Sequence, residues 1–235
     1  MSLTAYLGPS MPVLDLPGTR NAEACVPFAA GWYSEGQPEP LRTVARQHAR
    51  LDDVDVELIK GFGSGCMLTT TGPQPAGDVQ PFRWGPLLFG FRGGLDPFEE
   101  VFERPLVARL SPQALTATRS RSPEAVLFMT WLELLQGNVE TDQLADGLER
   151  LVATVQDLAL TNQATADFAI VVTNGSSLVT LRTGTGDDLP PMYTLLGSDE
   201  TPIPPRGRIV TTEQLFPGSW TSLEAHSMVI FTEDS

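Results

Sequence analysis

The stretch from Leu87 to Phe98, with the sequence LLFGFRGGLDPF, holds the residues of this chain whose types and spacing could support chemistry. Its apolar start, Leu87 to Phe89, predicts a buried strand. Gly93 and Gly94 allow backbone angles that other residues avoid, so we expect the strand to end there in a sharp turn. Free backbone N–H groups beside such glycines can bind an oxyanion. Arg92 adds a cation, which makes this strand end the first candidate for a functional site.

Arg92 allows two interpretations. It can bind an acidic ligand, because a guanidinium pairs well with carboxylates, or it can pair with a carboxylate of the nearby Asp96, Glu99 or Glu100. Cys66 is a second candidate as a reactive thiol, although packing in the core is the commoner role of a buried cysteine. Neither residue alone identifies a reaction.

The remaining reactive side chains do not form a metal or cofactor site. Cys25 and Cys66 are too far apart in the sequence for metal spacing or for a disulfide framework. The histidines, His48 and His226, lie in unrelated contexts, which leaves too few ligands for zinc. The GFGSG segment that begins at Gly61 lacks the Gly-Lys-Ser/Thr ending of a phosphate-binding loop. We therefore expect no metal and no cofactor.

Composition and charge exclude several classes of partner. The formal net charge is −14 and the isoelectric point is near 4.4, so polyphosphates are repelled, and no basic cluster offsets this repulsion. The first ten residues lack the basic and apolar segments of a signal peptide, and no apolar run approaches the length of a membrane span. We expect an acidic cytoplasmic protein that binds neither nucleic acid nor membrane.

The pattern of apolar residues predicts strands at both ends of the chain and two helices between them. Strands are expected at Leu3–Leu7, Val26–Tyr33, Gly65–Thr71, Phe168–Thr173, Ser177–Arg182, Met192–Leu196, Arg208–Thr212 and Ser227–Thr232. An apolar helix begins at Ser122-Pro123-Glu124, and an amphipathic one, Thr141–Leu160, follows a threonine cap. Leu41–Leu51 fits an exposed helix or an edge strand, and Val54–Ile59 a short helix. This order predicts an α+β layered domain with antiparallel sheets.

A series of short motifs in this order resembles a known family. They are Met1-Ser2 before Tyr6-Leu7-Gly8, Gly31-Trp32-Tyr33, the strand Cys66–Gly72, LLFGFRGGL, the helix start at Ser122, and the endings NGSSLVTLRTG, IVTTEQL and Gly218-Ser219-Trp220. Together they resemble the class II glutamine amidotransferases, which have the N-terminal-nucleophile hydrolase fold, and among these the amidohydrolase branch of ergothioneine biosynthesis. The resemblance covers most of the chain. It implies a four-layer αββα sandwich with two antiparallel sheets, formed by residues 1–235 as a single domain.

The chemistry of that family requires five groups. An N-terminal Cys is the nucleophile, and its own α-amine is the base. An Arg in an Arg-x-x-Thr strand pairs with the glutamine carboxylate. An Asn-Gly pair after a His forms the oxyanion hole. An Asp at the start of the central helix holds the substrate ammonium, and a Gly-Trp turn lines the pocket.

This chain departs from the family at most of these positions. The positions that match by resemblance are Ser2 for the nucleophile, Arg92 and Gly93 for the oxyanion hole, and Gly31, Trp32, Leu68, Thr71 and Ser122 for the substrate pocket. Leu68 replaces the carboxylate-binding Arg, and Ser122 replaces the Asp. An apolar side chain cannot pair with a carboxylate, and burial of that charge without a partner would cost several kcal/mol.

Two functions fit these substitutions. The first is a pseudoenzyme, which keeps the scaffold and acts as a non-enzymatic binding, scaffolding or regulatory protein with a protein partner or a small anionic ligand. The alternative is an active amidohydrolase on a glutamine-like or γ-glutamyl amide, with Ser2 as the N-terminal nucleophile once Met1 is removed.

Overall fold

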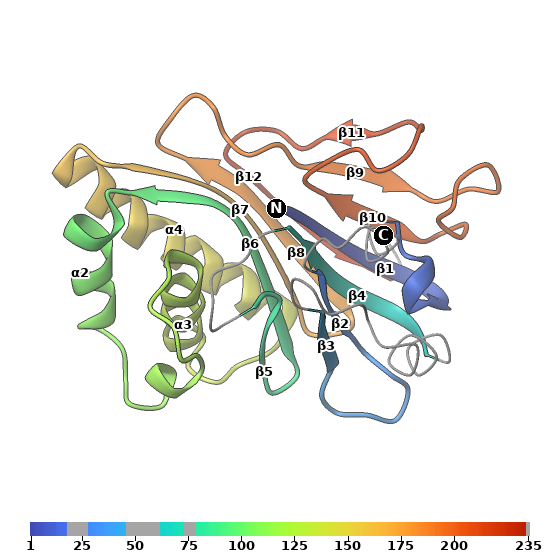
Figure 1. The fold of residues 1–235 in the computed structure, drawn as a ribbon, viewed down its shortest axis with the longest axis horizontal. Coiled ribbons are helices and arrows are strands. Elements are labelled where there is room, and N and C mark those ends of the chain that lie inside the picture. The colour runs from blue at the N-terminus through green and yellow to red at the C-terminus, as the bar shows by residue number, and fades with distance from the viewer. Residues whose placement is uncertain (18–27, 46–61, 73–78, 234–235) are drawn as a thin grey trace.

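The computed structural model describes residues 1–17, 28–45, 62–72 and 79–233, in which two antiparallel sheets lie face to face (Figure 1). The seven-stranded sheet has the order β11-β9-β10-β1-β4-β2-β3, and the five-stranded sheet has the order β12-β8-β7-β6-β5. The strands of the first are β1 (Ser2–Pro12), β2 (Phe28–Trp32), β3 (Leu41–Ala45), β4 (Gly63–Thr71), β9 (Tyr193–Leu196), β10 (Arg208–Thr211) and β11 (Thr221–Ser222). The strands of the second are β5 (Phe82–Trp84), β6 (Leu87–Asp96), β7 (Thr165–Thr173), β8 (Ser177–Gly184) and β12 (Ser227–Thr232).

Alternation of side chains along β1 explains how the sheets pack. Leu3 and Leu7 belong to the apolar cluster that fills the space between the sheets, together with Leu88 of β6 and Val171 of β7. Tyr6, one residue out of phase, belongs to a separate cluster on the outer face of the seven-stranded sheet. Successive strand residues point to opposite faces, so this period of two fixes which residues of β1 can reach the other sheet.

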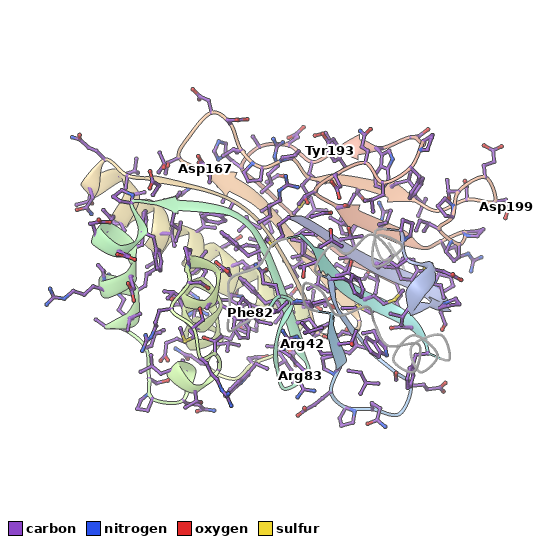
Figure 2. The ribbon with its side chains drawn as sticks, viewed as in Figure 1. Arg42, Phe82, Arg83, Asp167, Tyr193 and Asp199 are labelled. Atoms are coloured by element: carbon purple, nitrogen blue, oxygen red, sulfur yellow. The ribbon has the colours of Figure 1, made fainter. Side chains whose placement is uncertain are left out.

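Two arginines close one edge of this sandwich. Arg83 of β5 donates a hydrogen bond to the backbone oxygen of Pro40 at 3.0 Å. Arg42 of β3 donates to the backbone oxygen of Val79, which lies just before β5. Figure 2 shows the two side chains near one another, where the edge strands of the two sheets meet.

Helices cover the other face of the five-stranded sheet (Figure 1). They are α2 (Arg104–Val107), α3 (Pro123–Leu135) and α4 (Thr141–Asn162), with short turns at Phe98–Glu103 and Ala114–Thr116. Phe82, labelled in Figure 2, stacks on Phe128 of α3 with ring centroids 5.1 Å apart. Phe89 lies 5.5 Å from the Trp131 ring in the same cluster. Among the described residues, no helix is both long and apolar enough to cross a bilayer.

The two sheets and the helical layer confirm the α+β fold predicted from the sequence. Residues 41–45 form the edge strand β3, and not a helix. The outer face of the seven-stranded sheet carries its own apolar cluster, which includes Phe28 and Met67. The helix predicted at Val54–Ile59 lies outside the described residues, as do Cys25 and His48.

Three local predictions are wrong. The strand from Leu87 does not turn at Gly93 and Gly94; β6 continues to Asp96 and pairs with β7 over that whole length. Ser122 is the N-cap residue of α3, but its side chain makes no capping hydrogen bond. Thr141 does not cap α4, since its hydroxyl pairs with that of Ser177 at 2.9 Å.

Candidate functional site

Arg92 lies on the face of β6 that meets the seven-stranded sheet. Gly90, two residues earlier, shares this face, because a Cβ placed on it would lie 2.4 Å from the Cδ1 atom of Leu3. The Arg92 guanidinium crosses to the end of β10 and donates from Nη1 to the hydroxyl of Thr212 at 2.9 Å and to its backbone oxygen at 3.3 Å. Arg92 therefore joins the two sheets.

Thr212 also holds the start of β1. Its hydroxyl accepts the backbone N–H of Leu3 at 3.0 Å, and its own N–H donates to the Leu3 oxygen at 3.0 Å. Since the described residues give Arg92 no carboxylate partner, the predicted pairing with the acidic run after it is wrong. The actual partner is a threonine 120 residues further along the chain.

Gly93 permits a close approach between strands. Its φ angle is +145°, and a Cβ at this position would lie 2.1 Å from the backbone oxygen of Asp167 on β7. No residue with a side chain fits there without displacing the backbone. The glycine thus serves the pairing of β6 with β7 and not a turn.

A cavity of about 380 Å³ opens beside Arg92. Its wall consists of Met1, Arg92, Gly93 and the loop segment 188–191. Arg182 of β8 fixes that loop by donating to the backbone oxygens of Pro190 at 2.9 Å and Leu189 at 3.5 Å, and it also donates to the backbone oxygen of Leu223 at 2.7 Å. The wall of the cavity therefore contains both the guanidinium of Arg92 and the carboxyl of Asp188, and its loop is anchored by a second arginine.

Ser2 does not face this cavity by the register of its strand. It pairs with Thr71 of β4, which in turn pairs with Phe28 of β2, and Phe28 belongs to the outer cluster. Paired residues share a face, so Ser2 lies on the outer side of the sheet, whereas Arg92 approaches from the inner side. Ser2 is 7% exposed.

The positions that match the glutamine pocket are filled by apolar packing. Leu68 is fully buried in the cluster between the sheets and pairs with Gly31. A Cβ on Gly31 would lie 2.7 Å from the Cδ2 atom of Leu88, so the side chain of Leu88 occupies the space above this glycine. Trp32 points the other way and lies in the outer cluster, with its ring 5.8 Å from that of Phe62.

The Phe91 N–H and Ser122 do not contribute to the cavity beside Arg92. The backbone N–H of Phe91 donates to Oε1 of Gln80 at 2.5 Å, and Gln80 is 2% exposed. This N–H is therefore satisfied within the protein. Ser122 lies at the start of α3, in the helical layer, and is not part of the cavity wall beside Arg92.

The thiol of Cys66 is a core group. Its Sγ atom lies 3.1 Å from the hydroxyl of Thr173, and burial raises the pKa of the thiol to about 12. The neighbouring Tyr33 donates from its hydroxyl to the backbone oxygens of Pro86 and Thr173 at 2.7 and 2.9 Å, and burial raises its pKa as well. The thiolate form, which is the nucleophile, is thus suppressed at neutral pH.

In the described part of the chain, no group of three or more metal-ligating side chains could hold an ion.

Comparison with known proteins places this geometry in a fold. No family model matches the sequence, and no curated protein matches it. A solved glutamine aminotransferase class-II domain protein from Silicibacter pomeroyi is similar in structure, with a TM-score of 0.71, 21% identity, and coverage of 98% of this chain and 94% of that one. The chain has the fold of a class II glutamine amidotransferase.

Two further structures agree with this fold. The glutamine phosphoribosylpyrophosphate amidotransferase of B. subtilis superimposes with a TM-score of 0.63 at 12% identity; all of this chain is covered, but only 48% of that one. A predicted glutamine amidotransferase from Pseudomonas aeruginosa gives a TM-score of 0.55 at 12% identity, with 100% of this chain and 98% of that one covered.

Within this amidotransferase fold, the sequence-predicted residues fall into separate groups. Arg92 and Gly93 share the cavity wall with Met1, Ser2 pairs with Thr71, and Gly31 pairs with Leu68. Sequence reasoning missed the residues that hold the site together, which are Gln80, Arg182 and Thr212. Of these, Arg182 lies in the motif NGSSLVTLRTG and Thr212 in the motif IVTTEQL, and nothing in either motif indicates the partner of the residue.

Proposed function

We propose that this chain is a catalytically degenerate protein with the class II glutamine amidotransferase fold, which acts as a non-enzymatic binding or regulatory protein. The observation that carries the proposal is the arrangement of Ser2 and Arg92. A nucleophile must share a cavity with the group that stabilises the oxyanion. Ser2 belongs to the outer face of its sheet, whereas Arg92 lines a cavity on the inner side.

The packing around Leu68 supports the loss of glutamine binding. Leu68 is 0% exposed and lies among apolar side chains that join the two sheets. A substrate carboxylate placed there would lose its water shell and gain no partner, at a cost of several kcal/mol. The space is filled by Leu88 and Leu3 in the described structure, so no solvent can compensate.

The cavity beside Arg92 supports a binding role. A guanidinium has five N–H donors, and only Nη1 has a partner among the described residues. Arg92 lines a cavity of about 380 Å³, which is within the size range of small-molecule sites, and Asp188 lines the same cavity. A small anionic ligand, such as a carboxylate or dicarboxylate, is the class that this group would recognise.

An assay of amide hydrolysis tests the proposal. The purified protein is incubated with glutamine and with γ-glutamyl amides, and ammonia and glutamate are quantified beside the Ser2→Ala variant. We expect both proteins to give the rate of buffer alone. Hydrolysis by the wild type that disappears in Ser2→Ala would support the active amidohydrolase instead. Intact-mass analysis of the same sample is the companion measurement, because retention of Met1 blocks the α-amine that a Ser2 nucleophile requires.

A further inference from the structure

A second cavity lies on the helical side of the molecule. It has a volume of about 420 Å³ and opens between the turn that joins β5 to β6 and the C-terminal end of α3. Trp84 and Leu87 form one wall, and Leu132 and Glu133 form the other. None of its lining residues lines the cavity beside Arg92. The volume suits a small organic molecule.

Glu133 is the one charged side chain among the described residues that line this cavity. Its Oε2 atom accepts the backbone N–H of Ser111 at 2.8 Å. Hydrogen bonds from the side chain and backbone of Ser111 lower the pKa of this carboxyl, so it is ionised at neutral pH. No group of opposite charge in the described wall neutralises it, since neither arginine nor lysine lines the cavity.

The end of α3 adds to the negative potential. The helix ends at Leu135, Gln136 follows in a left-handed conformation with φ of 52°, and the last turn contains no basic residue. The C-terminal end of a helix carries a partial negative charge, which favours cations. Arg150 of α4 donates to the backbone oxygen of Leu134 and offsets part of this charge, but it does not line the cavity.

Trp84 supplies an aromatic side chain to the same cavity wall as the carboxylate. The residue is half-buried in β5 and is part of the cavity wall together with apolar groups of Leu87, Leu132 and Leu135. A tryptophan face attracts cations, and alkylammonium groups are recognised by combinations of aromatic rings and carboxylates. Anionic and aromatic groups thus meet in a wall that is otherwise apolar or uncharged.

We propose that this cavity binds a small organic cation with an apolar body, in which Glu133 pairs with the charged group and Trp84 covers the alkyl substituents. The site is separate from the cavity beside Arg92, and the inference does not rest on the function proposed above. An alkylammonium compound can pair with Glu133 and contact Trp84 at once, whereas a neutral compound of the same shape can contact only the apolar part of the wall.

Nuclear magnetic resonance with matched probes tests the inference. Choline and its neutral isostere, in which carbon replaces the quaternary nitrogen, are titrated into the full-length protein, and the indole N–H signal of Trp84 is followed. That signal is assigned by its loss in Trp84→Phe. We expect choline to shift it at millimolar concentrations and to bind roughly tenfold more tightly than the isostere, as the loss of a cation–π contact and an ion pair implies.

Two charge variants locate the site. Glu133→Gln keeps an acceptor for the Ser111 N–H but removes the charge, so it should abolish the preference for choline over the isostere. Glu200→Gln makes the same change in charge at an exposed position next to Asp199, which Figure 2 shows at the opposite end of the molecule. It should leave binding unchanged. The proposal is overturned if choline and the isostere bind with equal affinity, or if choline does not shift the Trp84 signal. It is also overturned if Glu133→Gln binds choline as tightly as the wild type does.

Discussion

Nη1 of Arg92 lies 2.9 Å from the hydroxyl of Thr212, and the same hydroxyl accepts the backbone N–H of Leu3 at 3.0 Å. One threonine side chain thus connects the strand β6 of one sheet with the start of β1 in the other. Thr212 is 1% exposed, so its hydrogen bond with Leu3 forms away from water, whereas the bond with the half-buried Arg92 lies beside the cavity. An arginine at the position that matches the oxyanion asparagine by resemblance has acquired a role in joining the sheets.

Replacement of Thr212 should destabilise the protein through this hydroxyl. Thr212→Val keeps the shape but leaves the Leu3 N–H without its acceptor, which should lower the free energy of unfolding by about 1–3 kcal/mol. Thr212→Ser keeps the hydroxyl and is the matched control, with an expected loss below about 1 kcal/mol. Urea denaturation followed by circular dichroism measures both. Equal stabilities of the Val and Ser variants would show that the hydroxyl contributes nothing.

Arg92 should determine which ligands enter the neighbouring cavity. Arg92→Ala removes the guanidinium and should abolish calorimetrically detectable binding of dicarboxylates such as glutarate, because the charge-assisted hydrogen bonds are lost. Arg121, whose side chain is exposed, gives the matched control Arg121→Ala with the same change in net charge. If the two variants bind every detected ligand as the wild type does, the cavity does not recognise anions through Arg92.

The neighbouring glycines should differ sharply in their tolerance of a methyl group. Gly93→Ala forces a Cβ to within 2.1 Å of the Asp167 oxygen at a φ of +145°, so we expect a loss of several kcal/mol or failure to fold. Gly94 is the control on the same strand, since a Cβ there has no atom within 4 Å. Gly94→Ala should change stability by less than about 1 kcal/mol. Thermal unfolding compares them, and similar melting temperatures would contradict the close approach of β6 and β7.

Stability should fall in alkaline solution because of Cys66. Burial raises the pKa of this thiol from its ordinary 9.0 to about 12, so the folded protein holds the proton more tightly than the unfolded chain. The stabilisation of the folded state by the protonated Cys66 thiol is complete below pH 9 and is lost as the pH rises toward 12. Burial also raises the pKa of Tyr33, which therefore contributes in the same direction. Guanidinium titrations from pH 8 to 11 should show a shallower decline for Cys66→Ala than for the wild type, and parallel declines would argue against a buried neutral thiol.

The sequence predicted the fold more successfully than the site, for physical reasons. Short apolar runs such as residues 168–173 indicate the burial of a single strand, and such runs predict most of the strands. A glycine in the sequence does not reveal whether it permits a turn or a close contact, so Gly93 was interpreted wrongly. The partner of Arg92 is 120 residues away and is visible only once the sheets are assembled.

The short strand β5 and its neighbour Gln80 show the same limit. Phe82–Trp84 is too brief for a periodic signal, and Gln80 is a polar residue that the sequence gives no reason to bury. Its side chain nevertheless accepts the N–H of Phe91 eleven residues later. Contacts of this kind depend on the final packing and not on local propensity.

Covalent labelling tests the central claim most directly. A diazoketone analogue of glutamine alkylates an activated nucleophile in a site that binds glutamine, and intact-mass spectrometry detects the adduct together with the state of Met1. If the glutamine pocket is filled by Leu68 and its neighbours and Ser2 faces away from Arg92, the mass of the protein should not change, and Ser2→Ala should behave identically. A stoichiometric adduct on Ser2 in protein that lacks Met1 would contradict the account and establish this chain as an active amidohydrolase.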